Sequence, residues 1–203
     1  MMATTHALVG IAIAAAATFV APDLSLVAVG AAAAGGVFPD LDLYAGHRKT
    51  LHFPVYYSVM AVSATVMLAM SPSPILWGIA LFLVSAAIHS LMDALGGGLE
   101  LRPWQGTSQR AVYSHYHERW IRPRRWIRYD GAPEDLGLAI VASLPALFVF
   151  EGTIATGIVA LLSISAVYVL LRKPIVWMAE WLYAHIPGPV RVRLPRRFVE
   201  DLS

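Results

Sequence analysis

Six apolar stretches, separated by short polar segments, account for most of the chain. The dipeptides Pro22-Asp23 and Glu151-Gly152 and the Ser- and Pro-rich run 71–74 favour turns between neighbouring stretches. The pattern predicts six helical segments arranged as three hairpins. A single long helix kinked at Pro22 is the alternative for the first two, because neighbouring helices can satisfy the carbonyl that a proline leaves free. The predicted segments cover residues 7–21, 24–38, 53–70, 75–95, 136–150 and 154–171.

The composition changes the expected environment of these helices. Hydrophobic residues make up 58% of the chain and charged residues 14%, and the mean hydropathy is +0.62, far more apolar than ordinary globular proteins. We therefore predict an all-α integral membrane protein with about six short transmembrane helices plus interfacial amphipathic helices. No Lys or Arg precedes the first apolar stretch, and it shows no clear cleavage site, so it does not resemble a removable signal peptide. We expect it to belong to the mature fold.

The length suits one membrane-embedded domain spanning residues 1–203. We expect a four-helix core in 1–95, an interfacial basic and aromatic insertion in 96–135, a helical hairpin in 136–171, and an interfacial helix with a basic tail in 172–203. The chain contains no cysteine, so any metal ligands are nitrogen or oxygen atoms.

The cationic residues occur in three places: the pair Arg48-Lys49, the segment from Arg102 to Arg128, and the tail from Arg172 to Arg197. Six membrane crossings place all three on the same side. Basic loops favour the cytoplasmic side, so the pattern predicts a multi-pass protein with both termini in the cytoplasm. Five crossings would move only Met1 to the other side.

The polar insertion interleaves Arg with Trp and Tyr, a pattern typical of the membrane interface. Its simplest interpretation is a peripheral anchor. Alternatively, Arg102 and Arg110 bind the anionic headgroup of a substrate. Residues 173–185, with Trp177 and Trp181, resemble a second interfacial helix, and the tail after Ile186 is expected to be flexible or surface-bound. We expect no nucleic-acid partner, and the oligomeric state is left open.

Histidine and aspartate residues recur at the ends of the apolar segments. In the arrangement with six crossings they converge at one membrane level, and His89 and Asp93, four residues apart, share a helix face. Singly, each has a structural interpretation, such as Asp40 in a turn beside Pro39. Together, such groups beside hydrocarbon favour a functional site, because burying them is costly unless they pair or bind a metal. The predicted ligands are His6, Asp40, Asp42, His52, His89 and Asp93.

Mixed imidazole and carboxylate ligands suit Zn²⁺, Mn²⁺ or Fe²⁺ better than Ca²⁺ or Mg²⁺. Zinc is the first choice. Because six ligands exceed the three that a catalytic zinc ion takes from protein, we expect one to three ions.

The order of these motifs resembles the YdjM-like family of inner-membrane-associated, metal-dependent hydrolases, also called domain of unknown function 457. The resemblance covers about the first half of the chain. Lys49 replaces the family's usual Gly, and Phe53 stands where a small hydroxyl residue is common. The matching segments are Thr5-His6-Ala7, Pro39-Asp40-Leu41-Asp42, His47-Arg48-Lys49-Thr50-Leu51-His52, His89-Ser90-Leu91-Met92-Asp93 and Leu101-Arg102-Pro103-Trp104.

The resemblance implies a prokaryotic cytoplasmic membrane and a hydrolytic activity. A more distant similarity of motif order, to zinc-dependent phospholipases C, implies phosphodiester substrates. We therefore expect a membrane-embedded metal-dependent hydrolase that cleaves a phosphoester or ester bond of a lipid or other amphiphile at the cytoplasmic face. Arg48 is expected to stabilise developing negative charge, and His47 to share that role or relay a proton.

Two other functions remain open at this point. A metal transporter or sensor would use the same ligands, although transport sites usually lie near the bilayer midplane between repeats, and the chain has no visible repeat. In a non-catalytic scaffold, the His and Asp residues would pair with Arg48 and Lys49. Two cations are few for all of these groups.

Overall fold

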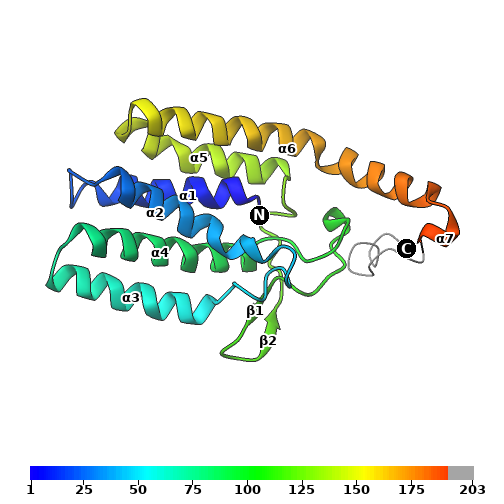
Figure 1. Cartoon of the computed structure of the whole chain (residues 1–203), viewed down its shortest axis with the longest axis horizontal. Helices are drawn as coiled ribbons and strands as arrows, with labels where there is room; N and C mark the ends of the chain where they lie inside the picture. Colours follow the sequence, from blue (N-terminus) through cyan, green and yellow to red (C-terminus); the bar gives the residue numbers. More distant parts are fainter. Residues whose placement is uncertain (192–203) are drawn as a thin grey trace.

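In the computed structural model, which describes residues 1–191, the chain is almost entirely helical (Figure 1). The basic tail from residue 192 onward lies outside the described residues. The α-helices are α1 (Ala3–Ala17), α2 (Leu26–Val37), α3 (Pro54–Met70), α4 (Pro74–Leu95), α5 (Pro133–Val149), α6 (Gly152–His185) and α7 (Gly188–Arg191). Two 3₁₀ turns, η1 (Phe38–Asp42) and η2 (Pro103–Gln105), and a hairpin of β1 (Val112–Ser114) and β2 (Arg119–Ile121) complete the described part.

Local sequence explains where these helices begin. Helices α3, α4 and α5 each have a proline in the first turn, where the missing N–H removes no helical hydrogen bond. The hydroxyl groups of Ser25 and Ser73 accept hydrogen bonds from the first turns of α2 and α4. The segment between Ala17 and Leu26 is a turn, so the predicted hairpin is confirmed and the single kinked helix across Pro22 is wrong.

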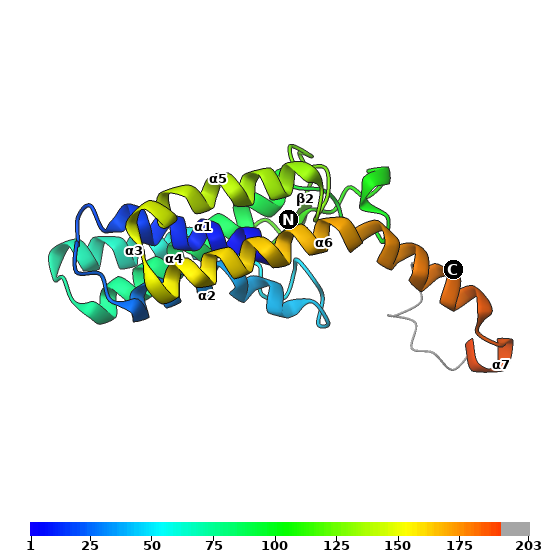
Figure 2. The same cartoon turned by 90° about the horizontal axis from the view of Figure 1, so that it is seen from above.

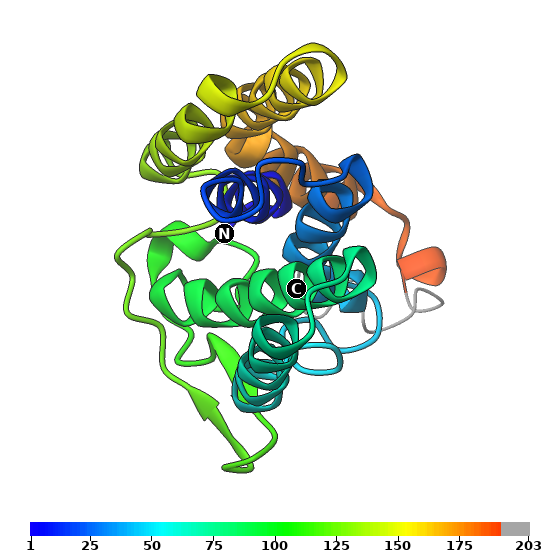
Figure 3. The same ribbon diagram turned by 90° about the vertical axis from the view of Figure 1, so that its left-hand side faces the viewer.

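Helices α1 to α6 run along the long axis in alternating directions (Figures 1 and 2). Seen end-on, α1 lies in the middle of the bundle, next to α2, α4, α5 and α6, whereas α3 packs on the outside of α4 (Figure 3). The core around α1 is built from small and aliphatic side chains, including Leu8, Ile11, Ala32, Ala146 and Ile158. Small residues let the helices approach closely.

Three glycines show how close this approach is. A Cβ atom at Gly10 would overlap the Ala32 carbonyl oxygen, and one at Gly36 would overlap the carbonyl oxygen of His6. Gly35 stands in the same relation to the backbone of Phe82 in α4. Helix α2 therefore packs closely against both α1 and α4 through its glycines. This contact fixes the position of His6 along the bundle axis relative to the other helices.

The alternation gathers the polar segments at one end of the bundle. The N-terminus, η1, the α2–α3 loop and the long insertion with its hairpin all lie there, while the opposite end carries only short turns (Figure 1). The hairpin β1–β2, with strands of three residues each, was not predicted from the sequence.

Helix α6 corrects one sequence-based expectation. A separate interfacial helix was expected from Lys173, but α6 continues without a break to His185 and contains Pro174 in its interior. Its second half extends past the end of the bundle (Figures 1 and 2). Helices α4 and α6, with 22 and 34 residues, are long and apolar enough to cross a bilayer, and α1 and α3 are shorter apolar helices.

The close packing at these glycines predicts how substitutions in α2 change the stability of the protein. Gly35→Ala forces a methyl group against the backbone of α4, and overpacking of this kind costs about 1–3 kcal/mol. Gly30→Ala is the matched control, because a methyl group at Gly30 in the same helix would meet no atom within 4 Å, and alanine favours helix. We expect thermal unfolding to show a lower Tm for Gly35→Ala and an unchanged or higher Tm for Gly30→Ala. Equal shifts would contradict close packing at Gly35.

Candidate metal centre

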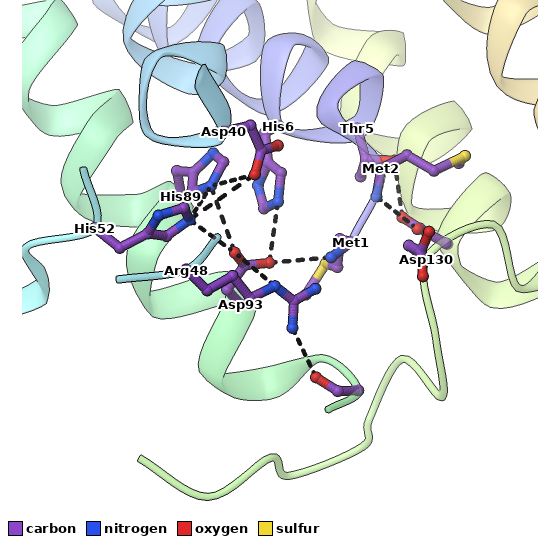
Figure 4. Close-up of polar contacts among 12 residues, drawn as sticks. Met1, Met2, Thr5, His6, Asp40, Arg48, His52, His89, Asp93 and Asp130 are labelled. Carbon is purple, nitrogen blue, oxygen red and sulfur yellow. Dashed lines mark hydrogen bonds and ion pairs between the residues drawn. The ribbon is translucent and has the colours of Figure 1, made fainter. Parts of the chain in front are cut away.

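Four side chains from three segments converge at the polar end of the bundle (Figure 4). Asp40 belongs to η1, His52 to the loop before α3, and His89 and Asp93 to the last turns of α4. One ligand atom from each lies within 4.8 Å of all the others. His52, His89 and Asp93 are fully buried, whereas the Asp40 side chain retains 17% of its accessible surface. The group can hold a metal ion, and Asp40 marks its accessible side.

The spacing of the ligand atoms fits a single four-coordinate ion. The Nε2 atoms of His52 and His89 are 3.1 Å apart, and they lie 3.2 and 3.5 Å from Asp93 Oδ2. Asp40 Oδ1 is 3.5 Å from His89 Nε2 and 3.8 Å from His52 Nε2. Ligands about 2.1 Å from a tetrahedral ion are separated by about 3.4 Å. These five distances, 3.1–3.8 Å, lie around that figure, and the longest of them is to Asp40.

Both imidazoles are held so that Nε2 faces the centre. His89 Nδ1 lies 2.6 Å from the carbonyl oxygen of Gly36, to which it donates a hydrogen bond. His52 Nδ1 lies 3.0 Å from Asp42 Oδ2. A hydrogen bond from one ring nitrogen to a carbonyl or carboxylate leaves the lone pair of the other nitrogen for a metal, and metal-bound histidines nearly always have such a partner.

Asp42 therefore occupies a different position from the one expected. It was predicted as a ligand, but it lies outside the group of four because its oxygens are engaged by the loop that follows. Beyond His52, they accept hydrogen bonds from the backbone N–H groups of Arg48, Lys49 and Leu51 and lie 3.2 Å from His47 Nδ1. This one carboxylate organises residues 47–52.

These contacts set the ionisation of the loop. Burial alone would raise the pKa of Asp42, but hydrogen bonds from His47, His52 and the backbone hold it far below its ordinary value. Burial likewise disfavours the charged form of His52, yet the Asp42 and Asp93 carboxylates raise its pKa. A metal ion binds the neutral imidazole, so protonation of His52 and metal binding exclude each other.

His6 borders the centre from α1. Its ring stacks on His89 with a centroid distance of 3.7 Å, and its Nε2 lies 3.3 Å from Asp93 Oδ1. The side chain is fully buried, and neither ring nitrogen makes a hydrogen bond within residues 1–191. These contacts with His89 and Asp93 place His6 beside the group of four and not within it.

Two fixed cations flank Asp93 on its two oxygens. Arg48 Nε lies 3.4 Å from Oδ2, and the Met1 ammonium group lies 3.0 Å from Oδ1. The centre thus contains three carboxylates, Asp40, Asp42 and Asp93, and the two fixed cations beside it both contact Asp93.

Arg48 is held in an uncommon conformation. Its φ of 58° lies in the left-handed region, and its side chain is buried, with Nη1 donating to the Gly97 carbonyl oxygen at 2.8 Å. Its own carbonyl oxygen accepts a hydrogen bond from the Tyr113 N–H in β1 at 2.9 Å. The insertion and the hairpin thus fix the guanidinium beside Asp93.

The remaining predicted residues lie further out. His47 is partly exposed and touches Asp42. Arg102 pairs with Glu180 of α6, and Arg110 lies over the Trp120 ring. Neither Arg102 nor Arg110 contacts the group of four in the described part of the chain.

Sequence reasoning missed the groups that act through the backbone. Gly36 supplies the carbonyl oxygen that orients His89, Gly97 the one that holds Arg48, and Tyr113 the N–H that holds the Arg48 loop. Backbone atoms carry no residue signature. Only the Gly35-Gly36 pair, two residues before the Pro-Asp motif, could have suggested a close approach.

Comparison of the chain with protein-family models, with curated proteins and with solved structures gives no match. The resemblance to the YdjM-like family therefore stays a prediction based on motif order.

The role of Asp42 can be tested by metal affinity. Asp42→Ala removes no ligand from the group of four but frees the loop and the His52 ring, and loss of such a supporting carboxylate typically weakens metal binding about 10- to 100-fold. Asp23→Ala, in the exposed α1–α2 turn, is the control and should bind as wild type. Competition with a chelator measures the metal dissociation constants of the two variants and of wild type. Wild-type affinity in Asp42→Ala would show that the loop does not depend on this carboxylate.

Proposed function

We propose that this protein is a membrane-embedded metal-dependent hydrolase that cleaves a phosphoester or ester bond of a lipid or other amphiphile. The observation that carries the proposal is the convergence of Asp40, His52, His89 and Asp93 at metal-ligand spacing, with a buried guanidinium beside them. Strongly perturbed titratable groups gathered in this way are typical of catalytic sites.

The outer surface of the bundle supports a membrane location. Helix α6 exposes Val159, Ile164, Val167 and Leu170, and only 11% of its most apolar stretch of 18 residues is buried. Apolar surface on this scale is rare on proteins that face water on all sides. The family resemblance favours the prokaryotic cytoplasmic membrane, and the charge distribution favours a metal centre and both termini at its cytoplasmic face.

The donor set selects the ion. Two imidazoles and two carboxylates suit zinc first, with Mn²⁺ and Fe²⁺ as alternatives. We propose one ion per chain, because the described residues bring together one group of four ligand atoms. When bound, such an ion acts as a Lewis acid, polarising the scissile phosphoryl or carbonyl group and increasing the acidity of water.

The residues of the chain divide the other tasks. His52, His89 and Asp93, fully buried, would hold the ion, since a catalytic zinc usually takes three protein ligands and keeps one position open. Asp40 lies on the open side, where its Oδ1 can complete the shell or accept a proton from the attacking water. Arg48 would stabilise negative charge on the substrate, and the partly exposed His47 would share that role or relay a proton.

The surroundings of Asp40 suit an amphiphilic substrate. Leu41, Leu43 and Tyr44 follow it directly and are exposed, with 66%, 56% and 79% of their surface accessible. Apolar side chains beside the accessible ligand would contact the hydrocarbon part of a substrate whose polar group reaches the centre.

The position of the ligands at one end of the bundle disfavours a transporter, whose binding site usually lies near the middle of the membrane. A scaffold is disfavoured by the convergence of four metal-ligand atoms within 4.8 Å of one another.

The proposal is tested with purified protein loaded with Zn²⁺ or Mn²⁺ and incubated with phospholipids and phosphodiester substrates. Wild type should release product, and His89→Ala should lose both the metal and the activity, because it removes a buried ligand. A protein that binds metal but hydrolyses none of these substrates, or a His89→Ala variant that stays active, would remove the support for a hydrolase.

Arg48→Gln separates charge stabilisation from metal binding. The glutamine keeps a donor but loses the charge, and removing one stabilising group from an active site typically lowers kcat about 10²–10³-fold. We expect this loss with metal content retained, since Arg48 is not a ligand. Arg128→Gln, at an exposed pair with Glu134, is the control and should leave kcat unchanged. If both variants behave alike, Arg48 has no role in the reaction.

A further inference from the structure

Two groups of cationic residues near the metal centre differ in their partners. Three on the side of α5 and α6 are paired with carboxylates: Arg102 with Glu180, Arg128 with Glu134, and Arg172 with Asp130. Surface pairs of this kind have little charge left for a partner.

The second group lies on and beside the β-hairpin, and its members have no carboxylate within 4 Å among residues 1–191. All are exposed, and Glu118 at the hairpin tip is the only acidic residue between positions 110 and 125. Two of them lie over aromatic rings, at 4.7 Å for Lys49 and Tyr113 and 5.8 Å for Arg110 and Trp120. These five free cations are Lys49, Arg110, Arg119, Arg122 and Arg124.

The hairpin lies beside the start of α3 and projects sideways from the bundle, across the direction of the helices (Figures 1 and 3). Its tip contacts α3 through the rings of Tyr116 and Tyr56, and His115 packs against Phe53. In a membrane that surrounds the bundle, a segment with this direction lies in the plane of the headgroups.

Helix α3 continues this surface along the bundle with apolar side chains. Val59, Val62, Val66 and Met67 lie on its outer side with 53–65% of their surface accessible, while the opposite face packs on α4. An apolar face that ends at a cluster of free cations is complementary to a lipid, whose acyl chain is followed by an anionic headgroup.

We propose that the five free cations and the outer face of α3 form a binding surface for an anionic phospholipid, with its headgroup at the hairpin and its chains along α3. This rests on the proposed membrane location of the bundle. Each Lys or Arg near an anionic membrane surface strengthens binding, and Trp and Tyr favour the interface, so both parts of the hairpin fit this partner.

The same surface is connected to the metal centre. The Tyr113 N–H donates to the Arg48 carbonyl oxygen at 2.9 Å, and His115 Nε2 lies 2.6 Å from the carbonyl oxygen of Lys49. A headgroup held by the hairpin therefore lies next to the loop that carries Arg48 and His52. The surface deepens the proposed function by selecting anionic phospholipids over zwitterionic ones.

The test uses the full chain in detergent, titrated with phosphatidylglycerol or with phosphatidylcholine of the same chain length, and native mass spectrometry to count bound lipid. One variant, Arg119→Gln/Arg122→Gln, removes two free cations. The matched control, Arg102→Gln/Arg128→Gln, removes two paired cations. Both pairs are exposed, so both variants should keep the wild-type Tm and metal content.

We expect wild type to prefer phosphatidylglycerol, and the hairpin variant to bind it roughly 30-fold more weakly, with phosphatidylcholine binding unchanged. The control should retain the preference. Absence of a preference, or equal losses in the two variants, would overturn the proposal. So would tighter binding of a single-stranded oligonucleotide than of phosphatidylglycerol, which would assign the cations to nucleic acid. Lipid binding is measured without hydrolysis, so an inactive protein leaves this result unaffected.

Discussion

The carboxylate of Asp42 is the contact on which the rest of the centre depends. Its two oxygens bind three backbone N–H groups and face two imidazoles within residues 47–52, and the side chain is completely buried. Through this one group, a loop without regular structure gains a fixed shape, with the His52 ring turned toward His89 and Arg48 toward Asp93. A buried carboxylate that accepts several hydrogen bonds is stable only as the anion, so the loop and the charge of Asp42 maintain each other.

The helices supply the second constraint. Because they alternate in direction, the ends of α2 and α4 and the starts of α1 and α3 meet at the same level, and each contributes one part of the centre. Gly35 and Gly36 let α2 approach α1 and α4 closely enough for the Gly36 carbonyl oxygen to orient His89. The hairpin and the insertion then cover the Arg48 loop from outside. The glycine contacts of α2 and the cover over the Arg48 loop therefore set the helix packing, the orientation of the ligands and the access to the metal centre.

Much of this arrangement could be predicted from the sequence, because it follows from periodicity. Six apolar segments imply alternating helices, and the alternation alone brings His52 of one segment near His89 and Asp93 of another. The role of Asp42 could not be predicted, because it depends on which way a carboxylate in a 3₁₀ turn points, and that is decided by the N–H groups of the following loop. Three-residue strands carry too little pattern to be recognised. The continuation of α6 beyond Lys173 was not predicted either, since the apolar stretch ends at residue 171 and charged residues follow it.

The most direct test of a metal centre at this position is X-ray absorption spectroscopy of the purified protein, combined with elemental analysis. The account predicts about one ion per chain in a shell of nitrogen and oxygen atoms, with the outer-shell scattering of two imidazoles. The scattering of one imidazole, or the whole ion, should be lost in His89→Ala. A chain that stays free of metal after incubation with Zn²⁺, Mn²⁺ and Fe²⁺, or an ion bound without imidazole, would contradict it.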